Sequence, residues 1–509
     1  MSREQHHPNS TPIVGASSLI LLTASLLSPT LTSSVLSQTV ESRVSAKASA
    51  PTRNEIISTA AAIVRASTKL SQVWPGYWPE DQAFIINVEG MGALLISPGP
   101  KPASFEPVPS GELPPELKGR AFFHKGVLSG AQRPFVIDYL IGEKKSAILV
   151  NAKDRDSKKT MSLILHEQFH GYQKTTFKGS EPQFVGPLAV KDRVAFAATA
   201  DVERSILVEA LIARAEGERQ QLIRQYFAVR RERERTIPSE VIKAEQGFER
   251  SEGTASYAEE AGLVAISGGD EAELQRLLVK QLSENLTLGG GAYTTTWFRG
   301  RSYGTGAALT HLIGQYDREA WRAKLEGGAK PDQLLEALVG AVPARSAARM
   351  AKTARKRFGY DAKHRELEPI IRAAEKTEIK SIPEFLRLDA YQVVFEPGVA
   401  GAAVRPGFSA VNMVALDSTT MALPRAIMFN VASETFSLTA RDRPVLLEFP
   451  TRFTVLLPAV PKIAGSGILP PGEHRFESLR MSGDGYDLQA DTPVTVRVEP
   501  HRMVVRLSS

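Results

Sequence analysis

The sequence predicts an α+β protein in which a largely helical part is followed by a separate all-β domain. Between about 191 and 375, apolar residues recur at helical spacing, as in "ERSILVEALIARAEGERQQLIRQYFAVRR". From about 385, short β-like runs such as "YQVVFEPG" and "VTVRVEP" are separated by proline and glycine. The simplest arrangement for these short strands is a small sandwich. A chain of 509 residues is also longer than a single hydrophobic core usually supports, which favours more than one domain.

Composition restricts the classes of protein and of site. The chain is 42% hydrophobic and 23% charged, which argues against disorder over most of its length. The formal net charge of +6 is small for this length and does not by itself imply nucleic acid, where a concentrated basic face would be expected, so we expect no nucleic-acid partner. The chain has no cysteine, which excludes disulfides, thiolate ligands and cysteine nucleophiles. A zinc site here must therefore use histidine and carboxylate ligands.

Residues 1–50 are predicted to be a leader and linker. The run "IVGASSLILLTASLLSPTLTSSVLS" is apolar or small, and its densest part, Leu19–Leu27, is too short for a comfortable membrane span. This pattern favours a bacterial-type signal peptide over a merely disordered leader, with cleavage near Ser33–Ser37 or Ala48–Ala50. No later segment reaches ~18 apolar residues. We therefore expect an exported protein, periplasmic or secreted, with no stable membrane span after the signal is removed.

Residues 51–160 are predicted to form an α/β part of the larger folding unit. A helix is expected over 54–72, followed by strands in "AFIINVEGMGALLISPGP". Residues 135–151 predict a hairpin whose second strand, Ser146–Val150, is an edge strand of the sheet. The next helix can be capped by Asp156 or Ser157.

Residues 161–380 are predicted to be helical, and 381–509 to be the β-rich domain. A break is expected at Pro238. The run "RRERER" at 230–235 mixes both charges, which is typical of a solvated helix face joined by ion pairs.

The stretch "LILHEQFHGYQ", Leu163–Gln173, carries the most specific chemical signal in the chain. On a helix, His166 and His170 project from one face about one turn apart, which suits two corners of a tetrahedral zinc. Glu167 lies beside the first histidine and can reach a metal-bound water as general base. The alternative is a bare core helix. Two unpaired buried histidines would be costly, which favours the ligand interpretation.

A third protein ligand is expected from "FERSEGTASYAEE" at 248–260. After His170 the next histidine is His311, so a glutamate is the natural candidate. Glu252 precedes Gly253, whose lack of a side chain would let this helix pack against the motif helix. Three other glutamates remain open as ligands: Glu203, Glu209 and Glu249. Of these, Glu249 is expected to orient a ligand rather than bind the metal.

These motifs resemble those of the gluzincins, zinc peptidases that include thermolysin and the aminopeptidase families. In that group the third ligand commonly stands in a Glu-Gly pair followed by a small residue and an aromatic, a pattern matched by Glu252, Gly253, Ala255 and Tyr257. The resemblance covers about 120–320 and implies a zincin-like metallopeptidase domain. The gap of 82 residues from His170 to Glu252 is longer than in the best-known gluzincins. It requires a helical insertion, which residues 201–245 supply.

A second motif, "RSYGTGAALTHLI" at 301–313, strengthens the comparison. Tyr303 and Gly306 form a Tyr-x-x-Gly that is predicted to open an apolar helix. By resemblance to the aminopeptidase-like gluzincins, Tyr303 donates a hydrogen bond to the oxyanion of the tetrahedral intermediate. Tyr293 and Arg301 are the next candidates for this role. Arg299 or Arg301 is a candidate for binding a substrate carboxylate or carbonyl.

The resemblance implies a zinc-dependent metallopeptidase that hydrolyses peptide bonds in peptide or protein substrates. Zn²⁺ would be held by His166, His170 and Glu252, with Glu167 deprotonating the zinc-bound water. Two alternatives remain: a zinc hydrolase of a non-peptide substrate, and a catalytically inactive gluzincin-fold binding protein. The intact HExxH argues against the inactive protein.

Overall fold

The computed structural model describes residues 51–507, except for 89, 100–102, 127, 129–134, 142–145, 153–154, 180–189, 285–294, 378, 380, 389, 399–406, 412–413, 417–419, 434 and 449–450. The expected leader, 1–50, and Tyr293 lie outside the described residues. Among the helices that are described, none combines the length and the apolar character needed to cross a bilayer.

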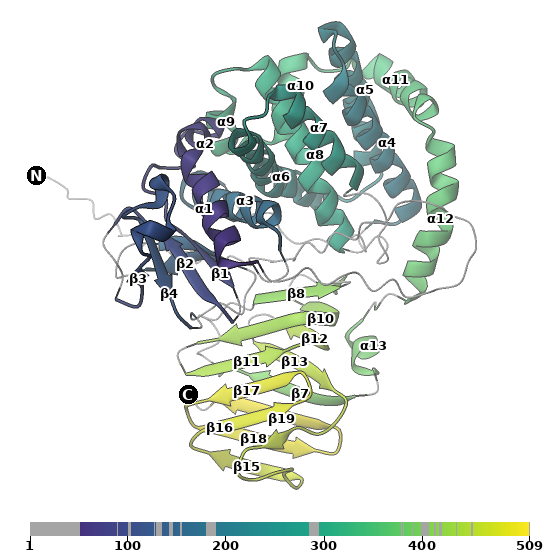
Figure 1. Ribbon diagram of the computed structural model, residues 1–509. Coiled ribbons are helices and arrows are strands. Elements are labelled where there is room, and N and C mark those ends of the chain that lie inside the picture. The colour runs from purple at the N-terminus through teal and green to yellow at the C-terminus, as the bar shows by residue number, and fades with distance from the viewer. Residues whose placement is uncertain are drawn as a thin grey trace, which may run out of the picture. The chain divides into compact units, whose positions relative to one another are not determined.

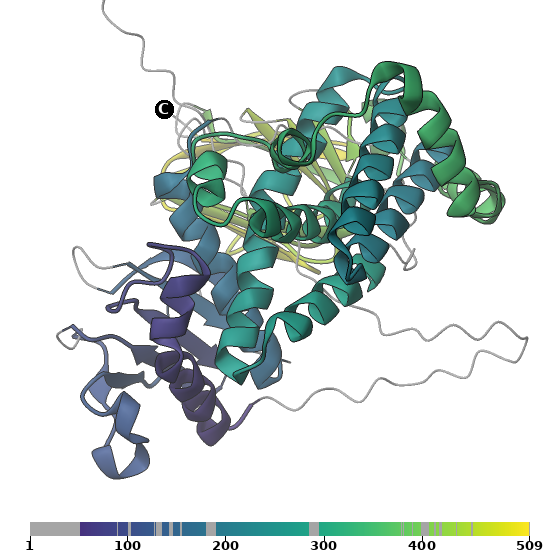
Figure 2. The same ribbon diagram turned by 90° about the horizontal axis from the view of Figure 1, so that it is seen from above.

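The chain is mixed α+β and forms two compact units. The larger takes in the described residues of 51–381 and 412–421, and the smaller takes in those of 382–411 and 422–507. A helical region is followed by a C-terminal β-sheet domain, as the sequence predicts (Figure 1). Figure 2 shows that, within the larger unit, the purple and blue elements up to about 151 lie to one side of the teal and green helices.

The larger unit begins with two helices and a six-stranded sheet. Its helices are α1 Arg53–Arg65 and α2 Ser67–Val73. Its strands are β1 Phe84–Val88, β2 Gly92–Ile96, β3 Glu106–Pro107, β4 Ala121–His124, β5 Phe135–Leu140 and β6 Ser146–Asn151. The strand order is β3-β4-β2-β1-β6-β5. Only the β1–β6 pair is parallel among the described pairs of this sheet.

The predicted hairpin over 135–151 is confirmed, because β5 and β6 pair antiparallel. The prediction that Ser146–Val150 is an edge strand is wrong. β6 lies between β1 and β5, and β5 forms the edge. All described side chains of β6 up to Val150 are buried, as expected for a strand paired on both sides and covered on both faces.

The motif helix, α3 Ser157–Thr176, covers one face of this sheet. The side chain of Asp156 accepts a hydrogen bond from the Lys159 amide at 2.7 Å, so Asp156 is the N-cap. Ile164 and Leu165 join one buried core with Ile148 and Val150 of β6. The position of α3 is therefore fixed by a cap at its beginning and by apolar packing along its length.

The rest of the larger unit is helical. Its helices are α4 Arg193–Ile212, α5 Glu216–Glu234, α6 Ser239–Ser267, α7 Glu271–Glu284, α8 Thr295–Tyr316, α9 Trp321–Glu326, α10 Pro331–Val339, α11 Ala344–Arg357 and α12 Tyr360–Thr377. The expected break falls at Pro238, which is the residue before α6. The segment 201–245 consists of most of α4, the whole of α5 and the first turns of α6.

The run at 230–235 does not form a uniformly solvated face, so that prediction is wrong for two of its arginines. Arg230 is 1% exposed and Arg233 is 3% exposed. Arg230 donates two hydrogen bonds of 2.8 Å to Glu249, and Arg233 pairs with Glu203 and Glu245. Because α5 packs against α4 and α11, one face of its last turns must point inward. Buried carboxylates then compensate the arginines on that face.

Helices α6 and α8 lie side by side and cross at a pair of glycines (Figure 1). A Cβ atom added to Gly253 would lie 2.7 Å from the carbonyl carbon of Gly306, and one added to Gly306 would lie 2.7 Å from Gly253 Cα. The expectation that Gly253 faces the motif helix is therefore wrong. Gly262 has that role, since a Cβ there would lie 2.9 Å from Leu165 of α3.

We expect Gly253→Ala to destabilise the protein by roughly 1–3 kcal/mol, because the new methyl group meets backbone atoms that cannot rotate away. Gly300→Ala in α8 is the matched control, since nothing lies within 4 Å of an added Cβ there. Alanine at this helical position should be neutral or stabilising by about 0.5–1 kcal/mol. Thermal unfolding of both variants tests the crossing, and equal shifts in their midpoints would contradict it.

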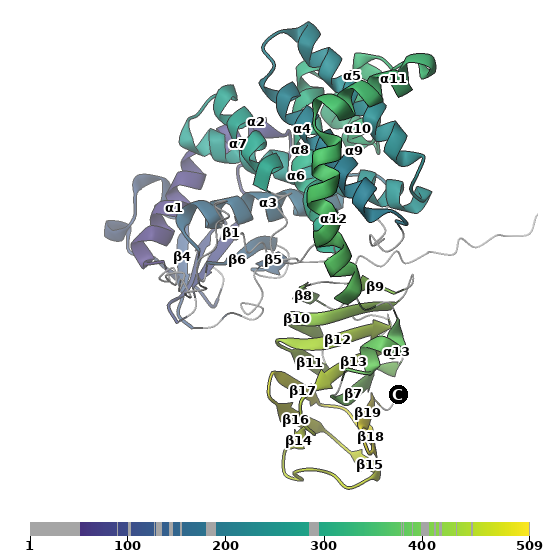
Figure 3. The ribbon, with the colours of Figure 1, turned by 90° about the vertical axis from the view of Figure 1, so that its right-hand side faces the viewer.

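The smaller unit contains α13 Ile382–Leu386 and the strands of the C-terminal sheet, except for β9 and the first two residues of β10, which belong to the larger unit. The strands are β7 Tyr391–Glu396, β8 Gly407–Val411, β9 Val414–Ala415, β10 Thr420–Ala432, β11 Phe436–Ala440, β12 Arg443–Glu448, β13 Arg452–Leu457, β14 Lys462–Ile463, β15 Gly472–Phe476, β16 Leu479–Gly483, β17 Tyr486–Ala490, β18 Val494–Glu499 and β19 Arg502–Leu507. They are joined in one continuous thirteen-stranded sheet (Figure 3). Three strands separate β7 from β11 in this sheet, yet the rings of Phe395 on β7 and Phe436 on β11 lie only 5.0 Å apart. The sheet therefore folds over on itself, so that two of its parts face each other as the layers of a sandwich do.

Candidate metal centre

His166 and His170 face each other across one turn of α3. Their Nε2 atoms are 3.1 Å apart. The other ring nitrogen of each is already bonded: His166 Nδ1 to Glu259 Oε2 at 2.9 Å, and His170 Nδ1 to Gln173 Oε1 at 2.7 Å. Because both partners are oxygen acceptors, the Nδ1 atoms carry the protons in the neutral rings. Both Nε2 lone pairs are then directed at one small region, an arrangement that favours a cation.

Glu252, on α6, brings an oxygen to the same region. Its Oε2 lies 3.3 Å from His170 Nε2 and 3.6 Å from His166 Nε2. For zinc bonds of about 2.0–2.1 Å, the edge of a ligand tetrahedron is about 3.3 Å. The three separations of 3.1, 3.3 and 3.6 Å are close to that edge. These residues therefore fit three corners of a tetrahedral metal site.

Arg299, on α8, fixes the orientation of Glu252. Its guanidinium is bonded to Glu252 Oε1, and both side chains are buried. Glu252 Oε2 has no hydrogen-bond donor among the described residues. Burial alone would raise the pKa of Glu252, but Arg299 and His170 lower it well below its usual range. Glu252 is thus an ionised carboxylate with one oxygen paired and the other available to a cation.

The electrostatics of His166 also indicate a place for positive charge. Burial lowers the pKa of His166, but the nearby carboxylates of Glu252 and Glu259 outweigh it and raise the pKa to about 10. The surrounding carboxylates therefore stabilise a cation here, whether a proton or a metal ion.

The other candidate carboxylates lie elsewhere. Glu249 and Glu203 are held by buried arginines, as described above. Glu209 pairs with Arg357 on the surface. Of the four glutamates considered from the sequence, the structure brings only Glu252 to the histidines. Glu249 contacts Arg230 rather than a candidate ligand, so it does not have the orienting role that was expected.

Glu167 lies on α3 next to the first histidine and outside the group of candidate ligands. It is buried, and its Oε2 has no hydrogen-bond partner among the described residues. Burial raises the pKa of Glu167, although His170 and His166 act in the opposite direction. A carboxylate whose pKa is raised toward neutrality is a suitable general base.

Tyr303 lies against the same group. Its ring stacks on that of His166, with centroids 5.6 Å apart and an interplanar angle of 9°. Because α8 begins at Thr295, Tyr303 is inside the helix, and the prediction that it opens the helix is wrong. Burial raises the pKa of Tyr303 well above its usual range. Its hydroxyl therefore keeps its proton and can donate a hydrogen bond.

The two arginines proposed from the sequence as substrate ligands are both engaged within the protein. Arg299 binds Glu252, and Arg301 is buried in an ion pair with Glu245. Neither is free to act as a carboxylate clamp in this arrangement.

Two residues of the site were missed in the sequence. Glu259 supports His166, and Gln173 supports His170 while donating to Ser251 O and Thr254 Oγ1 at 2.8 Å each. Spacing contains the signal in both cases. Glu259 follows Glu252 by seven residues and Gln173 follows His170 by three, so each shares a helix face with a candidate ligand.

The site must be interpreted from its own geometry and chemistry. Comparison of the chain with protein-family models, with curated proteins and with solved structures gave no match.

Proposed function

We propose that this chain is a zinc metallopeptidase of the gluzincin type. The observation that carries the proposal is the convergence of His166 Nε2, His170 Nε2 and Glu252 Oε2, each held by a partner on its other side. Neutral imidazole and carboxylate are ligands that zinc prefers when cysteine is absent. A bare core helix would have no reason to orient three such groups toward one point.

The residues around this point have separable roles. Zinc, when bound, supplies a Lewis acid that polarises a carbonyl group and lowers the pKa of water. Glu167 takes a proton from the attacking water molecule. Tyr303 donates a hydrogen bond to the oxygen that becomes negatively charged in the transition state. Arg299 and Glu259 hold the ligands in place.

The neighbouring strand β5 favours a peptide substrate over a non-peptide one. Among the described strands, β5 pairs with β6 alone, so no described strand occupies its other edge. It lies along α3: Ile137 packs against Gly171, and Asp138 pairs with Lys174. An extended peptide can add to such an edge through its main chain. The edge is therefore placed beside the helix that carries the two histidines.

Elemental analysis combined with peptide turnover tests the proposal. We expect about one zinc per chain, loss of peptide hydrolysis after chelation, and recovery when zinc is returned. Bound zinc without hydrolysis of casein or a peptide library would favour the non-peptide hydrolase. Absence of any bound transition metal would support an inactive binding protein and contradict the proposal.

Replacing Tyr303 by phenylalanine should lower kcat by roughly 10²-fold while leaving zinc content and KM nearly unchanged, because the lost hydrogen bond matters mainly in the transition state. Tyr316→Phe is the matched control on the same helix, since the Tyr316 hydroxyl is buried with no hydrogen-bond partner among the described residues. Steady-state kinetics of both variants provides the measurement. If Tyr303→Phe has a normal kcat, another group donates the hydrogen bond to the oxyanion.

A further inference from the structure

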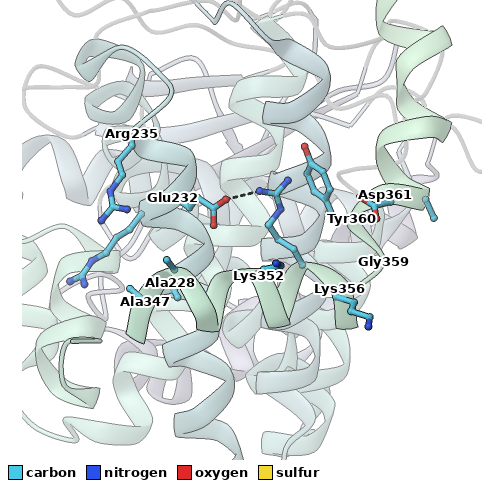
Figure 4. Close-up of a pocket in the computed structure, with 13 residues that line it drawn as sticks. Ala228, Glu232, Arg235, Ala347, Lys352, Lys356, Gly359, Tyr360 and Asp361 are labelled. Atoms are coloured by element: carbon cyan, nitrogen blue, oxygen red, sulfur yellow. Dashed lines mark hydrogen bonds and ion pairs between the residues drawn. The ribbon is translucent and has the colours of Figure 1, made fainter. Parts of the chain in front are cut away.

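A second candidate site lies in the same unit, in an open pocket between α5, α11 and the beginning of α12. The pocket has a volume of about 650 Å³, within the range of small-molecule sites. Figure 4 labels several residues that line it: Glu232 on α5, Arg235 directly after α5, Lys352 and Lys356 on α11, and Tyr360 at the beginning of α12. None of the residues that line it belongs to the candidate metal centre.

The charge of this pocket is strongly unbalanced. Five cationic side chains line it: Arg231, Arg235, Lys352, Arg355 and Lys356. Only two acids, Glu232 and Asp361, line it with them. Glu232 is bonded to Arg355 at 2.6 Å, and Arg231 is paired with Glu336, which does not line the pocket. Asp361 alone therefore opposes the remaining three cations.

Arg235, Lys352 and Lys356 form the unpaired group. No carboxylate in the described part of the chain makes an ion pair with any of the three. Three like charges around one pocket repel one another, and this repulsion is relieved when an anion binds between them. The three cations stand at different points along the pocket. An anion with several charges can therefore interact with more than one of them, and it is attracted more strongly than a monovalent anion.

The sequence of α11 explains how the charges accumulate. The helix has six cations and no acid, the cations being Arg345, Arg349, Lys352, Arg355, Lys356 and Arg357. Cations are common in the last turn of a helix, because they stabilise the negative end of the helix dipole. Lys352 stands before that turn, yet it also lines the pocket. The dipole alone therefore does not account for the arrangement.

The backbone and the ring of Tyr360 complete the pocket. Gly359, Tyr360 and Asp361 place the beginning of α12 in its wall. The amide of Gly359 is bonded to Lys356 O and that of Ala362 to Gly359 O, whereas the amides of Tyr360 and Asp361, at the start of the helix, have no intrahelical acceptor. The guanidinium of Arg355 lies 3.6 Å from the centre of the Tyr360 ring, which holds that arginine between Glu232 and the ring.

We propose that this pocket binds a small polyanion carrying two or more phosphate groups, with Arg235, Lys352 and Lys356 as its charged ligands. Phosphate oxygens accept hydrogen bonds from ammonium and guanidinium groups. The volume admits more than a single phosphate ion. The site is separate from the proposed peptidase centre and does not depend on it.

Titration calorimetry with inorganic pyrophosphate, and with orthophosphate as the weaker probe, tests the proposal on the full chain. Lys352→Gln/Lys356→Gln should weaken pyrophosphate binding at least ~10-fold relative to the unchanged protein. Arg345→Gln/Arg349→Gln is the matched control, because it removes the same charge from the same helix outside the pocket. That control should change the affinity by less than about twofold, and affinity in the unchanged protein should fall as salt is added.

The controls separate the alternatives. Pyrophosphate also binds zinc, but both double variants leave the metal centre intact, so any such contribution is equal in the two. Both double variants should unfold at the same midpoint temperature as the wild-type protein, since Arg345, Arg349, Lys352 and Lys356 are exposed. Equal loss of affinity in the two variants would mean that the overall charge of α11 attracts the anion, and would overturn the proposal. So would absence of pyrophosphate binding by the unchanged protein.

Discussion

Glu167→Gln is expected to retain zinc and to lose ~10²–10⁴-fold in turnover. Glutamine keeps the size of the side chain but cannot accept a proton at neutral pH. Because Glu167 is outside the group of candidate ligands, the affinity for the metal should change little. Zinc content by elemental analysis and kcat for a peptide substrate, measured on the same preparation, are the required readouts.

The matched control for this variant is Glu209→Gln. Glu209 is an acid on α4 that pairs with Arg357 and lies away from the histidines. It makes the same carboxylate-to-amide change and should leave both readouts unchanged. It also tests the earlier alternative in which Glu209 binds the metal. If the Glu167→Gln variant hydrolyses peptides at an undiminished, metal-dependent rate, Glu167 is not the general base.

His166→Ala is expected to abolish both zinc binding and turnover. It removes one of three protein ligands, and the two that remain hold zinc poorly. Dialysis against a zinc buffer followed by elemental analysis measures the loss. His364→Ala on α12 is a control for the loss of a histidine, since His364 contacts Tyr360 and not the candidate ligands.

A graded variant separates ligands from the residues that support them. Glu259→Gln removes the carboxylate from His166 Nδ1 but leaves the imidazole. The loss of such a partner typically weakens metal affinity by about 10–100-fold, so zinc should bind more weakly without being lost. If His166→Ala keeps stoichiometric zinc, or if Glu259→Gln weakens zinc more than His166→Ala does, then the assignment of His166 as a ligand is wrong.

The features predicted correctly are those determined by local sequence. The helix from Ser157 needs only the Asp156 cap and an apolar face, and the hairpin over 135–151 needs only two β-like runs with a turn between them. The proximity of Glu252 to the histidines was inferred from a motif, and the geometry agrees with it. Local spacing also contained the signals for Glu259 and Gln173.

The features that were missed depend on which elements pack together. The identity of the edge strand depends on the pairing of β6 with β1, which lies more than fifty residues earlier. The burial of Arg230 and Arg233 depends on the helices around α5. The partner of Gly253 is Gly306 of α8, and that helix also supplies Arg299 to Glu252. Spacing within one helix contains no information about any of these contacts.

The contact between Gly253 and Gly306 has a consequence for how firmly Glu252 is held. At the crossing the two helices touch through main-chain atoms, which have no rotamers to exchange. Gly253, the residue next to Glu252, therefore has no side-chain conformational entropy to lose when a metal binds. A ligand attached to such a rigid point needs little reorganisation, so the affinity is not reduced by the entropy of ordering it. This kind of preorganisation would appear calorimetrically as a small entropic penalty on metal binding, and it would be lost if a side chain at either glycine pushed the helices apart.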